Sequence, residues 1–284
     1  MTLKIQKNYP LKAHTTLGVG GVAQMYIEVA DFYELQQFLQ ENKGPIFVLG
    51  NGSNVLIRDG GIDGVVLKLK GDFKTIQVLG NRLICGAGVS LSKVAQVAME
   101  NDLGGFEFLA DIPGTFGGGL PTNAGAFGQK LSDVLVSLDA LDRDGHEKHF
   151  DDFSQWSYRF CPLENLIFTG AVLRAKESKP KSEIKALQLV YRDKRKATQP
   201  WGVRTAGSTF KNPKEQSAGF LIEKVGLKGY KGNGCEMSAK HANFLVNVSA
   251  SANELEDFIQ FVADKVLTAT GIYLEREIKC IGKR

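Results

Sequence analysis

Apolar residues recur at helical spacing in several stretches of the chain. In the first, apolar side chains at 32, 35, 38 and 39 fall on one face, and Asp31 and Glu34 have the spacing of a capping box. The pattern therefore predicts an amphipathic helix that begins after Asp31. Similar periodicity, with glycine as the stop signal at 226 and 271, predicts helices that begin near residue 90 and that cover 181–196, 218–225 and 253–270.

Short apolar runs separated by turn residues predict strands between these helices. They cover 25–29, 46–49, 55–57, 65–69, 82–85, 134–141, 146–150, 165–174 and 244–248. The first three strands and the first helix form a predicted β-α-β-β unit, and the turn at 142–145 predicts an antiparallel hairpin. Residues 272–281 alternate, with Glu275, Glu277 and Lys279 on the side opposite to the apolar residues.

Composition places the chain among ordinary globular proteins. It has 284 residues, of which 43% are hydrophobic and 23% charged, and this length predicts two or three domains. The net charge of +4 is modest and dispersed, so small anionic ligands suit it as well as nucleic acid does. The N-terminal residues lack the apolar region of a signal peptide, and no apolar run is long enough to cross a bilayer. We expect a cytoplasmic protein with no membrane partner and no nucleic-acid partner.

The cysteines and histidines give no metal-binding pattern. The four cysteines lie far apart in the sequence, and none of the short paired spacings of zinc or iron–sulfur sites occurs. We therefore expect reduced cysteines that serve in packing, and no metal site.

Glycine is concentrated in residues 109–128, which read LADIPGTFGGGLPTNAGAFG. Such glycines can adopt positive φ and let backbone N–H groups approach a phosphate, but they also suit a series of tight turns. From this loop alone the two alternatives are even. A second loop, GNGSN at 50–54, offers backbone donors with the side chains of Ser53 and Asn54, and by itself favours a simple turn.

Three polar residues outside these loops are candidates for chemistry. Ser208 lies in a turn with Lys211 and Asn212, and a capped turn is the more common explanation. Arg159 follows an aromatic residue and suits bidentate binding of a carboxylate or phosphate, although a surface arginine has the same appearance. Glu277 is a candidate acid or hydrogen-bond partner, or a solvated strand residue.

Together these segments resemble the UDP-N-acetylenolpyruvoylglucosamine reductases of bacterial cell-wall synthesis, in the shorter (type II) class of that family. The motifs follow the family's order along almost the whole chain. They are TTLGVGG from Thr15, GNGSNVLIRDGG from Gly50, DIPGTFGGGLPTNAGAFG from Asp111, Tyr158-Arg159, AGSTFKNP from Ala206, AGFLIEKVGLKG from Ala218, KHANFLVN from Lys240 and LEREIKCIG from Leu274.

The resemblance implies an α+β fold, with a two-domain FAD-binding fold of the vanillyl-alcohol-oxidase (PCMH) type and a third α+β domain that binds the UDP-sugar. The implied domains are 1–65 completed by 273–284, then 66–197, then 198–272. FAD is expected to be bound non-covalently, because neither glycine loop contains a histidine. The expected cofactor-binding residues are Gly50, Asn51, Gly52, Ser53, Asn54, Pro113, Gly114, Thr115, Gly118, Gly119, Asn123 and Ala124.

The resemblance also implies a reaction. NADPH reduces FAD, and the flavin N5 then delivers hydride to C3 of the enolpyruvyl ether. By the same resemblance Ser208 gives the proton to C2, while Arg159 and Glu277 stabilise the enolate-like charge. The substrate-binding residues implied, most weakly at the diphosphate, are Tyr158, Lys196, Lys211 and Asn212. A monomer is expected, with NADPH and the UDP-sugar as its small-molecule partners in peptidoglycan precursor synthesis.

The sequence departs from the family's usual residues at several positions. Arg276 and Lys279 stand where the family usually has Pro and Arg, Arg204 replaces a less charged residue, and Phe160-Cys161-Pro162 replaces a more polar continuation. These departures leave two alternatives open. One is another FAD-dependent oxidase or dehydrogenase of the same superfold, and the other is a catalytically silent protein that binds FAD or a UDP-sugar.

Overall fold

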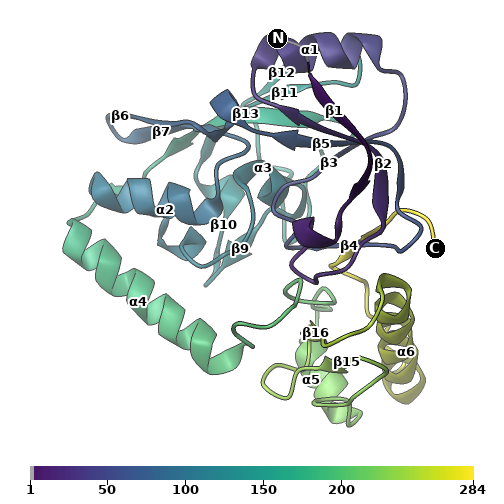
Figure 1. Cartoon of the computed structure of the whole chain (residues 1–284). Coiled ribbons are helices and arrows are strands. Elements are labelled where there is room, and N and C mark those ends of the chain that lie inside the picture. Colours follow the sequence, from purple (N-terminus) through teal and green to yellow (C-terminus); the bar gives the residue numbers. More distant parts are fainter. Residues whose placement is uncertain (1–2) are drawn as a thin grey trace. The chain divides into compact units, whose positions relative to one another are not determined.

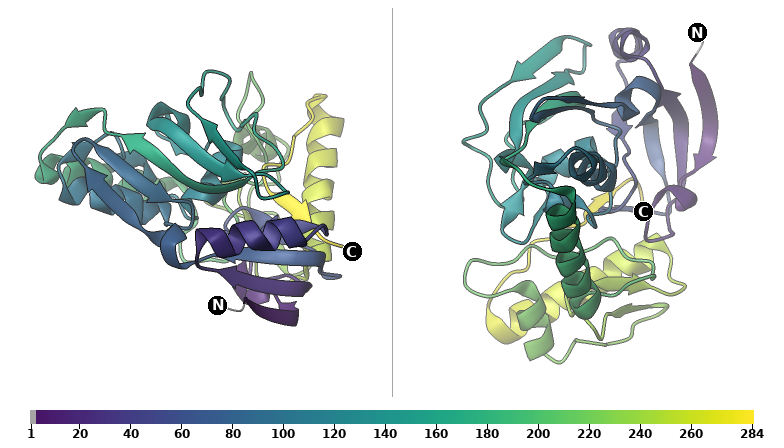
Figure 2. Two further views of the ribbon diagram at one scale, coloured as in Figure 1. Left: turned by 90° about the horizontal axis from the view of Figure 1, so that it is seen from above. Right: turned by 90° about the vertical axis from the view of Figure 1, so that its left-hand side faces the viewer.

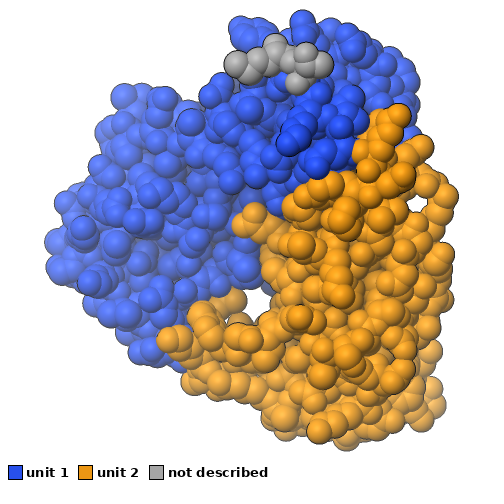
Figure 3. Space-filling view, in the orientation of Figure 1, with its two compact units in different colours: residues 1–6, 26–50, 64–193 blue, residues 7–25, 51–63, 194–284 orange. Residues whose placement is uncertain are grey.

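The computed structural model describes residues 3–284. Contacts divide the chain into two compact units, each assembled from three separate stretches and coloured separately in Figure 3. Unit 1 contains residues 1–6, 26–50 and 64–193, and unit 2 contains residues 7–25, 51–63 and 194–284. This division does not test the three domains expected from the sequence, which stay a prediction.

The helices begin where the sequence provides caps. Asp31 accepts hydrogen bonds from the N–H groups of Tyr33 and Glu34 at the start of α1, Ser90 caps α2, and Ser251 forms a capping box with Glu254 at the start of α6. The predicted helices are thereby confirmed. Their bounds are α1 Phe32–Glu41, α2 Leu91–Glu100, α3 Phe116–Gly119, α4 Lys181–Thr198, α5 Ala218–Lys224 and α6 Ala252–Thr270 (Figure 1).

The strands include the predicted ones and several short strands that the pattern did not mark. They are β1 Lys4–Pro10, β2 Val22–Val29, β3 Ile46–Val48, β4 Val55–Ile57, β5 Ile62–Leu69, β6 Ile76–Leu79, β7 Arg82–Gly86, β8 Leu103–Gly104, β9 Gly125–Ala126, β10 Gln129–Lys130, β11 Leu135–Leu141, β12 Glu147–Phe150, β13 Ile167–Arg174, β14 Glu177–Ser178, β15 Cys235–Met237, β16 Leu245–Asn247 and β17 Lys279–Ile281.

Unit 1 contains a five-stranded antiparallel sheet in the order β12-β11-β13-β7-β6, which Figure 2 shows in blue and teal from two further sides. The predicted hairpin between β11 and β12 is confirmed, with Leu141 opposite Glu147. Helix α4 follows the sheet and is tied to α2 by a hydrogen bond from Gln188 Nε2 to the carbonyl of Ala95, 3.4 Å long. Ile184 is the buried residue of α4, so most of this helix is open to solvent.

A second sheet has the order β1-β2-β5-β3, and the boundary between the two units falls within β1, β2 and β5. Strand β3 pairs in parallel with β5. The predicted β-α-β-β unit is wrong in one respect, because β4 does not join this sheet. Strand β4 pairs in parallel with β17, and Val55 lies opposite Lys279. The partner of β4 comes from a remote part of the chain, which local periodicity does not identify.

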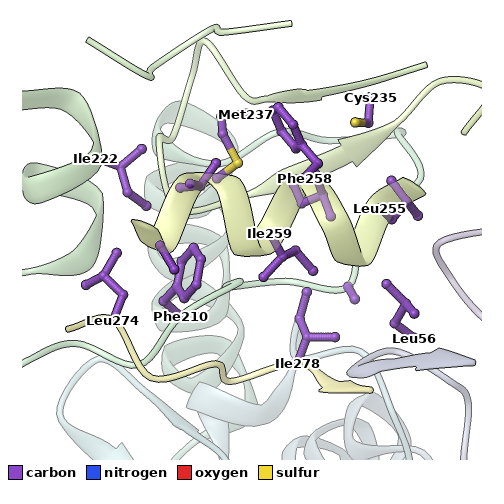
Figure 4. Packing of buried hydrophobic residues seen from close by; sticks show 14 of the residues in the cluster. Leu56, Phe210, Ile222, Cys235, Met237, Leu255, Phe258, Ile259, Leu274 and Ile278 are labelled. Atoms are coloured by element: carbon purple, nitrogen blue, oxygen red, sulfur yellow. The ribbon is translucent and has the colours of Figure 1, made fainter. Parts of the chain in front are cut away.

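Unit 2 is organised around α6. Figure 4 shows Cys235 and Met237 on one side of this helix, and Phe210, Leu274, Ile278 and Leu56 on the other. The apolar face of α6, which includes Leu255, Ile259, Val262 and Val266, is buried between these two groups. Burial of each such side chain contributes on the order of 2 kcal/mol to the free energy of unfolding, so the packing of α6 stabilises the unit strongly.

Two further expectations concern cysteines and membranes. All four cysteines are free thiols, and Cys85, Cys161 and Cys235 are buried, which confirms their expected packing role. Among residues 3–284, no helix is both long enough and apolar enough to cross a bilayer.

Candidate active site

The glycine-rich loop of unit 1 lies against the turn that precedes α2. The N–H group of Phe116 donates to the carbonyl of Val89 at 2.7 Å, and that of Gly117 donates to the carbonyl of Ala87 at 2.8 Å. A Cβ atom at residue 117 would lie 2.8 Å from Cβ of Ala87, so only glycine permits this approach. At Gly114 the φ angle is 127°, which also favours glycine.

The loop uses several of its own N–H groups internally. Those of Gly118 and Gly119 donate to Thr115, at 3.1 Å to Oγ1 and 3.0 Å to the carbonyl. The role of these two glycines and of Pro113 in cofactor binding stays a prediction. For Gly118 and Gly119 it now depends on close approach of the backbone rather than on donation by their N–H groups.

Gly50 belongs to the same unit and lies against Thr115. A Cβ atom at residue 50 would come within 2.6 Å of Thr115 Oγ1, a distance that side chains do not tolerate. The two glycine motifs quoted from the sequence thus meet at Gly50 and Thr115. Both residues are expected cofactor ligands, and the structure brings them into contact.

The remainder of the GNGSN loop, residues 51–54, lies in unit 2 and is held by hydrogen bonds from two other segments. The carbonyl of Gly52 accepts a hydrogen bond from the N–H group of Thr16 at 3.0 Å, and the carbonyl of Asn54 accepts one from Lys279 at 3.1 Å. Gly52 has φ +64°, and a Cβ atom there would lie 2.0 Å from the carbonyl oxygen of His14. Because these carbonyls are held by the protein, the loop keeps the tight form that an anion-binding loop requires.

These features fit a dinucleotide cofactor with a diphosphate. Glycine is required at positions 50, 52 and 117 because a Cβ atom there would meet Thr115 Oγ1, the carbonyl oxygen of His14 or the Ala87 side chain, so both loops are packed tightly against the protein. The candidate ligands Gly50 and Thr115 lie in unit 1, and Asn51, Ser53 and Asn54 lie in unit 2.

Arg159 lies at the tip of a tight turn in unit 1. Ser157 and Phe160 exchange backbone hydrogen bonds of 3.2 and 3.3 Å, and Arg159 has φ 55°, in the left-handed region. The guanidinium carbon of Arg159 lies 5.0 Å from the centre of the Tyr158 ring. The turn therefore presents a half-buried cation next to an exposed aromatic ring.

Asn123 connects this turn to the glycine-rich loop. Its Nδ2 donates to Ser132 Oγ at 3.0 Å and to the carbonyl of Ser157 at 3.1 Å, and its Oδ1 accepts from the N–H group of Ser132 at 3.0 Å. The residue is 2% exposed. Its side chain is thus engaged inside the protein, while contact of Asn123 and Ala124 with a cofactor stays a prediction.

Ser208 and Glu277 lie on neighbouring backbone segments of unit 2. Ser208 forms a β-bridge with Phe244, and the N–H group of Glu277 donates to the carbonyl of Thr209 at 2.9 Å. Thr209 is fully buried, and its hydroxyl accepts from the N–H group of Leu245 at 3.1 Å. Ser208 and Glu277, which are 69 positions apart in the sequence, are therefore linked through the backbone of the buried Thr209.

Glu277 is also linked to the GNGSN loop. Asn54 Nδ2 donates to the carbonyl of Glu277 at 3.2 Å, within unit 2. The structure thus brings together Ser208, Glu277 and one candidate cofactor ligand. Arg159 belongs to unit 1.

The candidate ligands of the substrate diphosphate already have protein partners. Lys211 forms an ion pair with Glu275, and Asn212 Oδ1 accepts from the N–H group of Ala218 at 3.0 Å. Lys196 Nζ lies 5.6 Å from the centre of the Trp201 ring. Their roles in substrate binding stay predictions.

The sequence analysis missed an ionic cluster beside Glu277. Arg58 and Arg276 both hydrogen-bond to Glu256 of α6, whose side chain is 8% exposed. Hydrogen bonds from Arg58 lead the causes that hold the pKa of Glu256 at about 2. A signal existed in the sequence, because position 276 falls on the inward side of the alternation in 272–281, where an arginine needs a partner.

Two family models match the chain. One is described as the UDP-N-acetylenolpyruvoylglucosamine reductase, C-terminal domain, and matches residues 199–281. The other is described as an FAD binding domain and matches residues 23–151. The two matches together contain the GNGSN loop, the glycine-rich loop, Ser208 and Glu277.

Curated relatives cover almost the whole chain. The UDP-N-acetylenolpyruvoylglucosamine reductase of Rickettsia akari (strain Hartford) is 41% identical over 98% of this chain and 96% of its own length. The protein of that name from Beijerinckia indica subsp. indica is 42% identical over 99% and 91%. A crystal structure of UDP-N-acetylenolpyruvylglucosamine reductase from Thermus caldophilus is 33% identical, with a TM-score of 0.85, and covers 99% of this chain and 100% of that one.

Proposed function

The chain belongs to the UDP-N-acetylenolpyruvoylglucosamine reductase family, and from that membership we propose that it uses NADPH to reduce UDP-N-acetylglucosamine enolpyruvate to UDP-N-acetylmuramate. It is an FAD-dependent oxidoreductase, and its α+β fold with an FAD-binding domain is the one expected from the sequence. The choice of NADPH and the roles of individual residues are the parts that we propose.

The two glycine loops would hold the FAD diphosphate. Gly50 and Gly52 let their loop pack against Thr115 and the carbonyl of His14, and the backbone of this packed loop would bind the phosphates. Bound FAD would supply the hydride-transfer chemistry that links NADPH to C3 of the enolpyruvyl group. The loops bind and orient, and the residues that act on the substrate are others.

Ser208 is the proposed proton donor to C2. Addition of hydride at C3 leaves carbanion character at C2, which is basic enough to take a proton from a serine hydroxyl. The β-bridge between Ser208 and Phe244 and the buried side chain of Thr209 fix the backbone that carries this hydroxyl. Neighbouring groups would then return a proton to Ser208.

Arg159 and Glu277 are the proposed partners of the substrate carboxylate. Negative charge grows on this group as hydride adds, so a fixed cation and a protonated carboxyl that donates a hydrogen bond both lower the barrier. Glu277 suits the second role because its backbone is held by Thr209 and Asn54. Tyr158, Lys196, Lys211 and Asn212 would bind the rest of the UDP-sugar.

The observation that carries the proposal is the arrangement of Ser208, Glu277 and Asn54 in unit 2. These residues come from three family motifs that are remote in the sequence. A backbone hydrogen bond of 2.9 Å between Glu277 and Thr209, and a bond of 3.2 Å from the Asn54 side chain to Glu277, connect the three segments. A protein that only bound FAD would not need Ser208 and Glu277 on backbone segments that are linked to a cofactor loop. We further propose that the protein is a cytoplasmic monomer. Its small-molecule partners would be NADPH and the UDP-sugar of peptidoglycan precursor synthesis.

Anaerobic stopped-flow spectroscopy of the flavin tests the proposal. NADPH should bleach the flavin of the purified yellow protein, and the enolpyruvyl substrate should restore its colour and give product that contains a solvent-derived proton at C2. In Ser208→Ala the first step should stay near normal, and the second should slow by about a hundredfold or more. Ser249→Ala, which removes an exposed hydroxyl of the same unit, is the matched control.

Other outcomes would point to the alternatives. Rapid reoxidation by oxygen with no preference for NADPH would favour another oxidase of the same superfold. Flavin that NADPH reduces but the substrate never reoxidises would favour a silent binding protein. Equal losses in both steps of Ser208→Ala would contradict the role given to Ser208.

A further inference from the structure

Glu256 lies at the centre of an ionic cluster in unit 2. Its Oε2 accepts from Arg58 Nε at 2.6 Å, and its Oε1 accepts from Arg58 Nη2 at 2.8 Å and from Arg276 Nη1 at 2.9 Å. The side chain of Glu256 is 8% exposed, whereas the side chains of Arg58 and Arg276 are 26% and 28% exposed. Arg58 therefore forms the bidentate pair that fixes a carboxylate most firmly, and Arg276 adds a third bond.

The cluster fastens the backbone on both sides of Glu277. Arg276 directly precedes Glu277 and forms a β-bridge with Phe210. On the other side, Arg58 Nη1 donates to the carbonyl of Gly282 at 2.8 Å. Glu256 is thus connected, through its two arginines, to positions 276 and 282.

Helix α6, which carries Glu256, is firmly packed in unit 2. Helix α6 has a capping box at its start, and its apolar face is buried in the core cluster that Figure 4 shows. Arg276 Nη2 reaches a second acceptor on the same helix, Gln260 Oε1, at 2.7 Å. A side chain on α6 can therefore transmit the position of the helix to the segment that carries Glu277.

A fixed position matters for a group that stabilises charge during a reaction. Hydrogen bonds to a developing charge depend on placement within a fraction of an ångström, and a displacement of about 1 Å can lower a rate by about a hundredfold. The backbone bonds from Thr209 and Asn54 restrain Glu277 near its own residue. The ionic cluster of Glu256, Arg58 and Arg276 restrains the same segment at positions 276 and 282.

We propose that Glu256 is a positioning residue of the reductase, which acts through Arg276 and Arg58 to hold the carboxyl group of Glu277 where it meets the substrate. The inference rests on the proposed function of Glu277. Glu256 hydrogen-bonds to Arg58 and Arg276 and acts through them.

Glu256→Gln is the decisive variant, because it keeps the shape of the side chain and removes the charge that both arginines share. The matched control is Glu223→Gln, which breaks an ion pair of the same unit, between Glu223 and Lys228 at 2.9 Å, that is not connected to residues 274–282. Each variant is measured as the FAD-loaded enzyme in both half-reactions. We expect Glu256→Gln to slow reoxidation by the enolpyruvyl substrate by between ten- and about a hundredfold, with reduction by NADPH changed less than about twofold.

Amide hydrogen exchange gives a second readout that does not depend on turnover. The N–H groups of Lys211 and Glu277 donate to Glu275 and Thr209 across this segment. In Glu256→Gln these amides should exchange faster than in the unmodified protein and in Glu223→Gln. If Glu256→Gln does not fold, Arg276→Lys keeps the charge, loses the second contact to α6 and should show the same two effects more weakly.

Combination with Glu277→Ala, which removes the hydrogen-bond donor, separates the inference from the function on which it rests. If Glu256 acts through Glu277, adding Glu256→Gln to Glu277→Ala should slow reoxidation no further. Multiplied effects, or equal slowing of both half-reactions by Glu256→Gln, would overturn the inference. Normal reoxidation in Glu277→Ala would refute the role of Glu277 itself, whereas slow reoxidation there with normal behaviour in Glu256→Gln would refute only the positioning role.

Discussion

Replacement of Asn123 should weaken unit 1 and disturb the turn that carries Arg159. The side chain makes three hydrogen bonds of 3.0 to 3.1 Å, two to Ser132 and one to the carbonyl of Ser157, in a site that is 2% exposed. Its φ of 42° lies in the left-handed region, which asparagine tolerates better than most residues. The residue therefore contributes through both its side chain and its backbone.

The size of the effect follows from these bonds. Each contributes about 1 kcal/mol net, so Asn123→Gly, which keeps the backbone conformation, should lose about 3 kcal/mol of unfolding free energy. Asn123→Ala adds left-handed strain of about 1 to 2 kcal/mol, offset in part by the greater chain entropy of glycine. The isosteric Asn123→Asp should lose about 2 kcal/mol or more, because two donated bonds disappear and a carboxylate oxygen faces the carbonyl of Ser157.

Urea denaturation of the three variants measures these differences, with the slope checked for two-state behaviour. The half-reactions of the reductase give the functional effect, since a displaced Arg159 should slow reoxidation by the substrate more than reduction by NADPH. Stability of Asn123→Asp within about 0.5 kcal/mol of the unmodified protein would show that the hydrogen bonds are not the source of the effect. Unchanged reoxidation in a destabilised variant would separate the turn from Asn123.

Three further results are expected. Gly52→Ala should weaken FAD binding by at least about tenfold, because the new Cβ atom would lie 2.0 Å from the carbonyl oxygen of His14 and must displace the loop. Flavin fluorescence measures the affinity, and an unchanged affinity would show that Gly52 is not part of the cofactor site. Hydrogen bonds from Arg58 are the first cause that lowers the pKa of Glu256 from 4.5 to about 2. The contribution of Glu256 to the free energy of unfolding is therefore complete above pH 4.5 and falls by about 2 kcal/mol by pH 3. Denaturation should show that the stability difference between the unmodified protein and Glu256→Gln narrows as the pH falls, and a constant difference would contradict this. Burial raises the pKa of Cys85 to about 12, so this thiol should resist alkylation at pH 8 until the protein is unfolded, and rapid labelling of the native protein, located by mass spectrometry, would refute its burial.

Local signals in the sequence predicted most of the regular structure. Helices α1 and α2 begin directly after Asp31 and Ser90, whose side chains cap them, and α6 ends directly before Gly271, which has φ 71°. These features depend on residues within one turn of each other. For that reason periodicity and capping were sufficient to find them.

Partners that are remote in the chain were harder to predict. Strand β6 is short and mostly exposed, so its pattern is weak, and the pairing of β4 with β17 joins residues 55–57 to residues 279–281. The side chain of Asn123 illustrates the same limit within the site. A polar residue in a glycine-rich loop suggested a ligand contact, but only the folded turn shows that its side chain hydrogen-bonds to Ser132 and Ser157.

The residues proposed for chemistry came from motifs, and their mutual arrangement came from the fold. Ser208 and Glu277 were separate candidates in the sequence, and Thr209 connects their backbones in the structure. The cluster of Glu256 was absent from the prediction because its three members lie on different segments; Arg58 and Arg276 belong to two of the quoted motifs, but Glu256 belongs to none. Arg276, a departure from the family's usual residue, is explained by its contact with Glu256.

The parallel pairing of β4 with β17 has a consequence for synthesis on the ribosome. Arg58 and Gly282, which hydrogen-bond to each other, are separated by 224 positions, and Asn54 receives its backbone partner from Lys279. A nascent chain that has not yet emerged as far as Lys279 carries the GNGSN loop without one of the two segments that fix it. Because translation proceeds from the N-terminus, unit 1 can begin to fold long before that loop is complete. Loading of FAD should therefore follow translation of β17, and a prematurely terminated chain should remain colourless and open to proteolysis.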